Sequence, residues 1–291
     1  MQGKLRNARV KGKLKIDDEI SSTNPIAVGD RVVFEEEQGE ESNCVIRSIV
    51  NRHNYIVRVS PHNKNQKHIV AANLDLALII ATLAEPRTSQ GFIDRFLITA
   101  EAYHIPVVIV INKVDLLKDK HRRQLEAWKE MYGAAGYQVF PMVALDLQSV
   151  QALEEILRHK TTLFCGHSGV GKTTLINQLI PDLNLRTTAV SNWSGKGQHT
   201  TTFAEMFDLK WGGRIIDTPG VKEFGLIDID REELSHYFPE MRSVLNECRF
   251  NNCLHLNEPG CAVKKAVAEK RISEDRYVSY VTILESIEEK W

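Results

Sequence analysis

The pattern of hydrophobic and polar positions divides the chain of 291 residues into three parts. In the first part, short stretches alternate between apolar and polar residues, which is typical of strands with one buried face. Strands are expected at 5–16, 30–36, 43–50 and 55–59, with a hairpin turn at 38–40. Short strands at this spacing predict a small β-barrel or sandwich.

The second part alternates continuous apolar runs with amphipathic segments. Residues 74–83 and 106–111 are almost entirely apolar, as strands buried on both faces require. Further strands are expected near 137–143 and at 161–165, with helices near 92–103, 122–132 and 150–158. Strands that alternate with helices predict a parallel sheet that is covered on both faces.

The third part, after about residue 225, is helical and contains three of the five cysteines. Its last helix is expected at 273–289, where Ser273 can cap the N-terminus and Glu274 and Asp275 suit the first turn. We therefore expect a multidomain fold. Its domains are a β-barrel at 1–70, an α/β domain at 71–225 and a helical domain at 226–291.

Composition narrows the class of protein. With 43% hydrophobic and 26% charged residues, the chain is neither a collagen, nor a disordered tail, nor a small disulfide scaffold. No apolar run reaches the roughly 18 residues of a membrane span, and the basic N-terminus lacks the apolar core of a signal peptide. We expect an intracellular protein without a membrane partner, whose odd number of cysteines favours metal binding over disulfides.

The formal net charge is −1, but basic residues gather at the N-terminus. Six of them precede the first acidic residue: Lys4, Arg6, Arg9, Lys11, Lys13 and Lys15. Such a cluster can neutralise phosphates of nucleic acid. It can equally be a solvated strand face, and the residues alone leave both interpretations open.

A phosphate-binding loop is predicted at 166–173, where GHSGVGKT fits the pattern GxxxxGK[ST] between an apolar strand and an apolar helix. Glycines let backbone N–H groups surround phosphate oxygens, while Lys172 reaches the β- and γ-phosphates and Thr173 supplies an oxygen to Mg²⁺. A glycine turn without a ligand is the alternative. The residues expected to bind nucleotide here are Gly166, His167, Ser168, Gly169, Val170, Gly171, Lys172, Thr173 and Thr174.

The sequence Asn112-Lys113-Val114-Asp115 indicates which base is bound. It follows the apolar strand at 106–111, and ligands bind at the carboxyl ends of such strands. The carboxylate of Asp115 can accept the ring N–H and the amino group of guanine, a donor pair that adenine lacks. Asn112 would brace the loop and Lys113 would lie along the base. An ordinary strand-to-helix turn is the alternative, but the position favours GTP or GDP.

A third motif, Asp217-Thr218-Pro219-Gly220, completes the nucleotide site. Asp217 can hold Mg²⁺ through water, and the amide of Gly220 can sense the γ-phosphate. Glycines and hydroxyls at 194–202 suit a segment that becomes ordered around the metal, with Thr200 or Thr201 as its ligand. The expected magnesium site therefore draws on Thr173, Thr200, Thr201 and Asp217.

The order of these motifs is unusual, because Asn112 precedes the phosphate loop, whereas small GTPases carry NKxD last. A sheet needs only the same strand ends side by side, so a circularly permuted domain can build the same pocket. Permutation also joins the segment after Gly220 directly to the cysteine-bearing region, which would connect that region covalently to the nucleotide site.

Cys248, Cys253, His255 and Cys261 are spaced as a zinc site. Three thiolates and one imidazole suit tetrahedral Zn²⁺, and four protein ligands make such a site structural. The alternative is that these cysteines are small core residues, but the intervening Asn, Pro and Gly residues are typical of loops. Cys44 and Cys165 lie in strand patterns and are expected to be packed thiols.

With these motifs in this order, the sequence resembles the RsgA family, the YjeQ/YloQ-type circularly permuted GTPases. The resemblance covers essentially the whole chain. It implies an N-terminal OB-type barrel on ribosomal RNA, a permuted GTPase domain with Mg²⁺ and GTP or GDP, and a zinc domain. It further implies a monomeric, cytoplasmic bacterial enzyme that hydrolyses GTP, is stimulated by the small ribosomal subunit and acts late in its maturation.

Hydrolysis needs a positioned water molecule and neutralised charge on the γ-phosphate. Val221 follows Gly220 where Ras-type enzymes carry glutamine, and valine cannot orient water. His199 resembles the histidine of the family's GxHTTT-like segment and is the candidate for the missing polar group, with Lys172 and Thr201 beside the phosphates. A solvent-exposed loop histidine is the alternative. Val143-Ala144-Leu145 departs from the family's Ser-Ala pair beside guanine, which would restrict that contact to the backbone.

Overall fold

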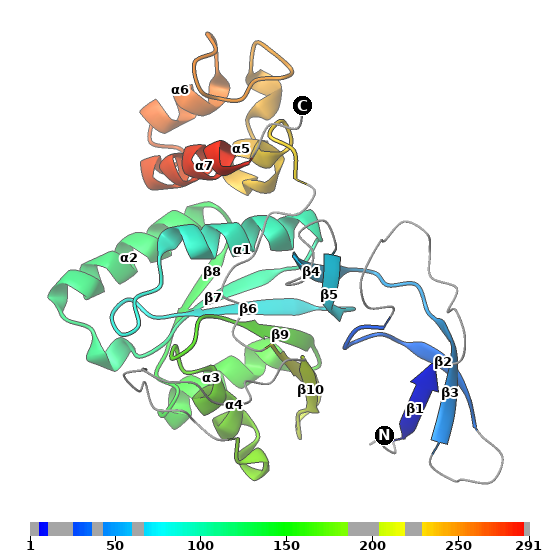
Figure 1. Cartoon of the computed structure of the whole chain (residues 1–291). Helices are drawn as coiled ribbons and strands as arrows, with labels where there is room; N and C mark the ends of the chain where they lie inside the picture. The colour runs from blue at the N-terminus through cyan, green and yellow to red at the C-terminus, as the bar shows by residue number, and fades with distance from the viewer. Residues whose placement is uncertain are drawn as a thin grey trace, which may run out of the picture.

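The computed structural model describes residues 6–10, 26–36, 43–59, 67–185, 204–218 and 229–287, and its three parts follow one another along the chain (Figure 1). The N-terminal strands lie to one side of a central α/β body, and a helical C-terminal domain packs on top of it. No helix among the described residues is both long enough and apolar enough to cross a membrane.

The centre of the molecule is a six-stranded sheet in the order β10-β11-β9-β6-β7-β8. All neighbours run parallel except the edge pair β10 and β11. The alternation of strands and helices predicts the parallel part, but not the antiparallel edge. The strands are β6 (Leu76–Ala81), β7 (Val107–Ile111), β8 (Gln138–Pro141), β9 (Thr161–Cys165), β10 (Glu205–Asp208) and β11 (Arg214–Asp217).

Helices cover both faces of this sheet, as predicted (Figure 1). Successive strand residues point to opposite faces, so Ile79 packs in the layer under α1 and α2, while Ile80 packs in the layer with α3 and α4. The helical elements are α1 (Gln90–Ala102), η1 (Val114–Leu116), α2 (Asp119–Ala134), α3 (Leu147–Leu157), α4 (Lys172–Leu179) and η2 (Pro181–Leu183).

The N-terminal strands form two sheets within the part of the chain that the structure describes. One has the order β1-β3-β2 and the other pairs β4 with β5, so a closed barrel is not formed by these residues alone. Ile56 and Ala71 pack into the core under α1, and the expected boundary at residue 70 falls inside β5. The strands are β1 (Asn7–Val10), β2 (Val32–Glu36), β3 (Asn43–Ile49), β4 (Tyr55–Val59) and β5 (Lys67–Ala72).

The C-terminal domain has its own apolar core, to which Ile98 of α1 contributes. Phe238, Met241 and Tyr280 are fully buried there. Ser273 occupies the N-cap position of the last helix, as expected, but its side chain makes no capping hydrogen bond. The elements are η3 (Leu234–Tyr237), α5 (Pro239–Arg242), η4 (Leu245–Glu247), α6 (Ala262–Ala268) and α7 (Glu274–Ser286).

Candidate nucleotide site and metal cluster

The phosphate loop connects the end of β9 to the start of α4, where the sequence predicts it. Gly166, Gly169 and Gly171 have positive φ angles of 151°, 84° and 100°. A Cβ atom on Gly166 would collide with the carbonyl oxygen of Ile80, and one on Gly171 would collide with the side chain of Asn112. Glycine is therefore required at both positions, because the loop needs this backbone and this close approach.

Lys172, the first residue of α4, lies inside the loop. Its Nζ donates to the carbonyl oxygens of Gly166 at 2.6 Å and His167 at 3.1 Å. An ammonium group has three donors, so one remains for a phosphate oxygen. Burial lowers the pKa of Lys172, and the nearby carboxylate of Asp217 opposes that shift. The arrangement places a positive charge where the phosphates of a nucleotide would lie.

Asp217 ends β11, which neighbours β9, so its carboxylate lies near the phosphate loop. Burial raises its pKa to about 6, although the charge of Lys172 lowers it. Its Oδ1 is buried and has no hydrogen-bond partner among the described residues. An unpartnered buried carboxylate oxygen fits a hydrated Mg²⁺, whose ligands are oxygens. Thr173 lies half-buried in the first turn of α4, next to Lys172.

The adjacent Thr218 serves the fold instead. Its hydroxyl donates to the carbonyl oxygen of Phe164 at 3.0 Å, which ties the end of β11 to β9. The predicted site residues His199, Thr200, Thr201 and Gly220 lie outside the described residues, as do Thr202 and Val221.

The NKVD segment, residues 112–115, is hydrogen-bonded to the phosphate loop. The buried side chain of Asn112 donates from Nδ2 to the carbonyl oxygen of Val170 at 2.8 Å, and its Oδ1 accepts from the amide of Ala144 at 2.9 Å. Lys113 donates from Nζ to the carbonyl oxygens of Gly169 at 2.8 Å and Glu85 at 2.9 Å. The NKVD segment and the phosphate loop, which are distant in sequence, thus lie side by side at the edge of the candidate site.

Asp115 lies in η1 at this edge and is exposed. Within the described part of the chain its carboxylate makes no hydrogen bond or ion pair, so both oxygens can accept from a ligand. In the neighbouring loop, the backbone of Ala144 is held by Asn112, while Leu145 is 71% exposed. This loop carries no hydroxyl at 143–145, so its polar groups there are those of the backbone.

Two contacts at this site are not predicted by the sequence. The ring of His167 lies on the ring of Phe92 in α1, with centroids 3.6 Å apart. Burial and the charge of Lys172 lower the pKa of His167. The carbonyl oxygen of Glu85 on Lys113 is the second contact. Neither has a signal in the sequence, because each joins segments that only the folded sheet brings together.

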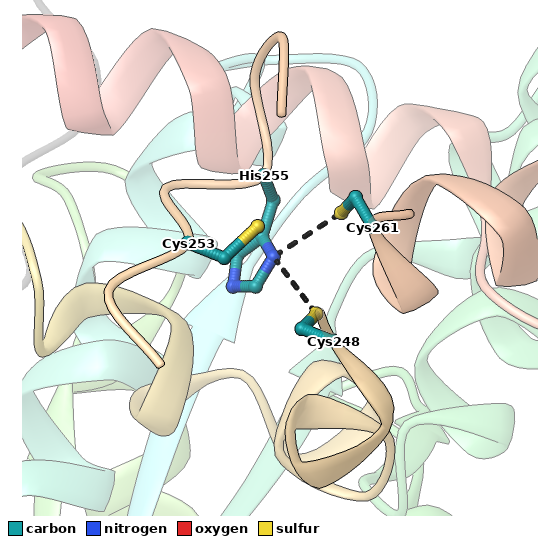
Figure 2. Close-up of side chains that lie close together, drawn as sticks. All are labelled: Cys248, Cys253, His255 and Cys261. Atoms are coloured by element: carbon teal, nitrogen blue, oxygen red, sulfur yellow. Dashed lines mark hydrogen bonds between the residues drawn. The ribbon is translucent and has the colours of Figure 1, made fainter. Parts of the chain in front are cut away.

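The cysteine cluster forms as the spacing predicts (Figure 2). One ligand atom from each of Cys248, Cys253, His255 and Cys261 lies within 4.8 Å of all the others. The Nδ1 of His255 lies 3.4 Å from the sulfur of Cys261 and 3.7 Å from that of Cys248. Three thiols and an imidazole nitrogen at this separation fit the donor set of a tetrahedral zinc site.

The surrounding loop holds the cluster. The carboxylate of Glu258 accepts from the amides of Leu254 and Leu256, each at 2.8 Å. Amide groups also donate to two of the sulfurs, from Ala262 to Cys248 and from Lys264 to Cys261, each at 3.4 Å. Such bonds orient metal ligands and stabilise thiolates. The two remaining cysteines are buried thiols, and burial raises the pKa of Cys165 to about 12.

Comparisons with known proteins agree with this geometry. The model of the RsgA GTPase family matches residues 49–227. Proteins named small ribosomal subunit biogenesis GTPase RsgA match from Bacteroides fragilis, at 48% identity, and from Christiangramia forsetii, at 46%. Each match covers 99% of this chain and 92% of the relative.

Solved structures match over nearly the whole chain as well. YjeQ from Thermotoga maritima has a TM-score of 0.75 at 32% identity, covering 96% of this chain and 88% of that one. YloQ, described as a circularly permuted GTPase, has a TM-score of 0.72 at 30% identity, covering 98% and 88%. Motif order, strand order and these matches lead to one conclusion: the chain belongs to the RsgA GTPase family and is a circularly permuted GTPase.

Proposed function

We propose that this GTPase binds GTP and GDP along the edge formed by the phosphate loop and the NKVD segment, and that it acts in biogenesis of the small ribosomal subunit. The single observation that carries the site is the set of side-chain hydrogen bonds from Asn112 and Lys113 to Val170 and Gly169. The ribosomal role follows from the relatives, which are named small ribosomal subunit biogenesis GTPases.

Different residues bind the guanine base and the phosphates of the nucleotide. The free carboxylate of Asp115 accepts from the guanine base, and backbone amides of 166–174 bind the phosphates. Lys172 stabilises the charge that develops during phosphoryl transfer. Asp217 and Thr173, with Thr200 or Thr201, would hold Mg²⁺, which would supply positive charge against the phosphates. The Gly220 amide senses the γ-phosphate.

The reaction also requires a polar group that positions the attacking water. We assign it to His199, since Val221 has no polar group. The expected result of His199→Ala is a loss of stimulated GTP turnover, with GDP affinity within a few fold of the wild type. An equal loss of turnover and affinity would remove the catalytic role, because an orienting residue acts mainly on the chemical step.

We assign RNA binding to the N-terminal part of the chain. Residues 1–70 would form an OB-type barrel that binds ribosomal RNA, with the boundary extended to the end of β5. Phe34 is 49% exposed on β2, where it pairs with Ile46 of β3. Exposed aromatic rings suit stacking on unpaired bases. The GTPase domain at 71–225 and the zinc domain at 226–291 complete the chain, which we propose to be a cytoplasmic monomer.

The decisive experiment is GTP hydrolysis, measured as phosphate release over many turnovers with and without purified small ribosomal subunits. Slow release that the subunit stimulates is the expected result. Lys172→Ala is the matched control, because it removes the phosphate contact but leaves the outer domains unchanged. A rate that the subunit leaves unchanged would argue against the ribosomal role, and hydrolysis of ATP as fast as of GTP would argue against the role of Asp115.

A further inference from the structure

Helix α1 contacts the phosphate loop with one side of its first turn. The ring of Phe92 lies on that of His167, with centroids 3.6 Å apart and planes inclined by 32°. The carbonyl oxygen of the same His167 accepts from Nζ of Lys172 at 3.1 Å. The residue that stacks on α1 is therefore also a residue that positions the phosphate-binding lysine.

The other side of the same turn contacts the C-terminal domain (Figure 1). Asp94 is fully buried and accepts from Nη1 of Arg276 in α7 at 2.5 Å. The side chain of Arg276 is only 1% exposed and also donates to Glu240 at 2.6 Å. The hydroxyl of Tyr132 in α2 donates to Asp94 at 3.0 Å. Breaking such a buried pair is strongly unfavourable, because the remaining charge stays buried.

These two contacts lie close together on one rigid element. Phe92 and Asp94 are two positions apart, which separates their directions by about 200° around the helix axis. Two further residues of α1 donate to α7: Gln90 to the carbonyl oxygen of Asp275 at 3.2 Å, and Arg95 to the hydroxyl of Ser286 at 3.0 Å. The first turn of α1 is thus held between the phosphate loop and the C-terminal domain.

We propose that the docked C-terminal domain preorganises the phosphate loop through the first turn of α1, with Phe92 and His167 as positioning residues. Arg276 fixes Asp94, α1 thereby fixes Phe92, and the ring of Phe92 sets the position of His167 and its carbonyl group. Nucleotide affinity then depends on the Arg276–Asp94 contact. Because coupling between sites is reciprocal, bound nucleotide must also strengthen the docking of the C-terminal domain.

This route is separate from the covalent connection after Gly220, and it rests on the proposed placement of the nucleotide at the phosphate loop. Coupling of this kind is carried by packed side chains and hydrogen bonds, and only an interaction energy between the two contacts can establish it. The test is therefore a double-mutant cycle on GDP affinity.

The cycle combines Phe92→Leu, which removes the ring but keeps an apolar side chain, with Asp94→Asn, which removes the charge but keeps the shape. Fluorescent N-methylanthraniloyl-GDP is titrated into the full-length protein with Mg²⁺. Each single variant is expected to weaken GDP binding about fivefold. In the Phe92→Leu background, Asp94→Asn should weaken GDP binding by a further factor of less than about two. Equal fold losses in both backgrounds would overturn the proposal.

Two further variants distinguish positioning from general damage. Phe92→Tyr keeps the ring and should restore the affinity that Phe92→Leu loses. Arg242→Met is the matched control, since Arg242 joins the same domain to Glu101 of α1 at 3.1 Å, far along the helix from Phe92, and is 51% exposed. Its GDP affinity should stay within about twofold of wild type. A loss as large as that of Asp94→Asn would contradict the proposed route.

Hydrogen exchange supplies a readout that does not depend on the variants folding equally well. GDP should slow the exchange of amides in α7 of the wild type, but not in Phe92→Leu. The same slowing in both proteins would also overturn the proposal. If the wild type itself fails to bind GDP, the placement of the nucleotide site is wrong; if it binds and the cycle is additive, only the coupling through α1 is wrong.

Discussion

The cysteine cluster and the nucleotide site assemble their ligand atoms over very different lengths of chain. The cluster uses residues 248–261, while the nucleotide site joins the ends of β7, β9 and β11, which lie within 107–217. In the cluster the donors are close in sequence and are mostly held by hydrogen bonds within one loop. In the nucleotide site the sheet holds the donors in place. We therefore expect the first site to depend on its metal and the second on the core.

The largest expected effect is the loss of the zinc ion that we propose for the cysteine cluster. Binding of structural zinc contributes about 10 kcal/mol or more to the folding of small zinc domains. Chelation, or Cys261→Ala, should therefore remove hydrogen-exchange protection from α6 and α7, while amides of β6, β7 and β9 stay protected. Cys44→Ala is the matched control, because Cys44 is a buried thiol outside the cluster. Uniform loss of protection would show that the two regions fold as one unit.

The next effect tests the nucleotide site. Lys172→Ala removes a buried ammonium that reaches into the phosphate loop. Hydrogen bonds from charged groups contribute about 1.5–3 kcal/mol, so GDP affinity should fall about ten- to a hundredfold. Calorimetric titration with GDP measures it. Unfolding of the C-terminal domain should be unchanged in this variant; a parallel loss of zinc content would contradict the separation of the two regions.

A smaller effect on stability is expected at Asn112. Asn112→Ala leaves the carbonyl group of Val170 and the amide of Ala144 without their buried partner. Each such group costs about 1–3 kcal/mol, so the free energy of unfolding should fall by about 2 kcal/mol or more. Urea denaturation measures this change. An unchanged midpoint would show that the two loops do not depend on each other.

The smallest effect sharpens the role of Asp217. Its carboxylate is buried with one oxygen unpartnered among the described residues, and burial raises its pKa to about 6. Asp217→Asn removes the buried charge, so the nucleotide-free protein should gain about 1 kcal/mol of stability. Thermal melts without nucleotide measure this gain. Melts with Mg²⁺-GDP measure the stabilisation by the ligand, which should decrease in the variant. Lower stability without ligand would show that the carboxylate supports the fold instead.

Much of the central fold follows from the sequence, because strands buried on both faces leave a strong signal. The apolar runs at 74–83 and 106–111 contain β6 (Leu76–Ala81) and β7 (Val107–Ile111), and the strand expected at 161–165 is β9. The helices begin and end within a few residues of the expected positions. The grouping of the four cluster residues and the position of the loop between β9 and α4 also follow from the sequence, since the residues of each are close in sequence.

The remaining features depend on tertiary contacts. β5 pairs with β4 over the segment KHIVAA, which follows several polar residues and does not alternate between polar and apolar positions. The buried contact of Arg276 with Asp94 joins residues 182 positions apart. A surface helix with an arginine in its first turn gives no sign of this partner. The N-terminal barrel remains a proposal, because the described strands form two sheets and not a closed one.

The strand order has a consequence for how the protein is made. β6, β7 and β8 leave the ribosome before β9, yet β9 is the strand that pairs with the open edge of β6. Until β9 emerges, the half-finished sheet exposes the unpaired N–H and C=O groups of β6, a strand with apolar side chains, and such edges are templates for pairing with other chains. In a GTPase with the usual motif order the phosphate-binding strand is synthesised first. Permutation therefore places this exposed stage of synthesis in the half of the domain that carries residues 112–115.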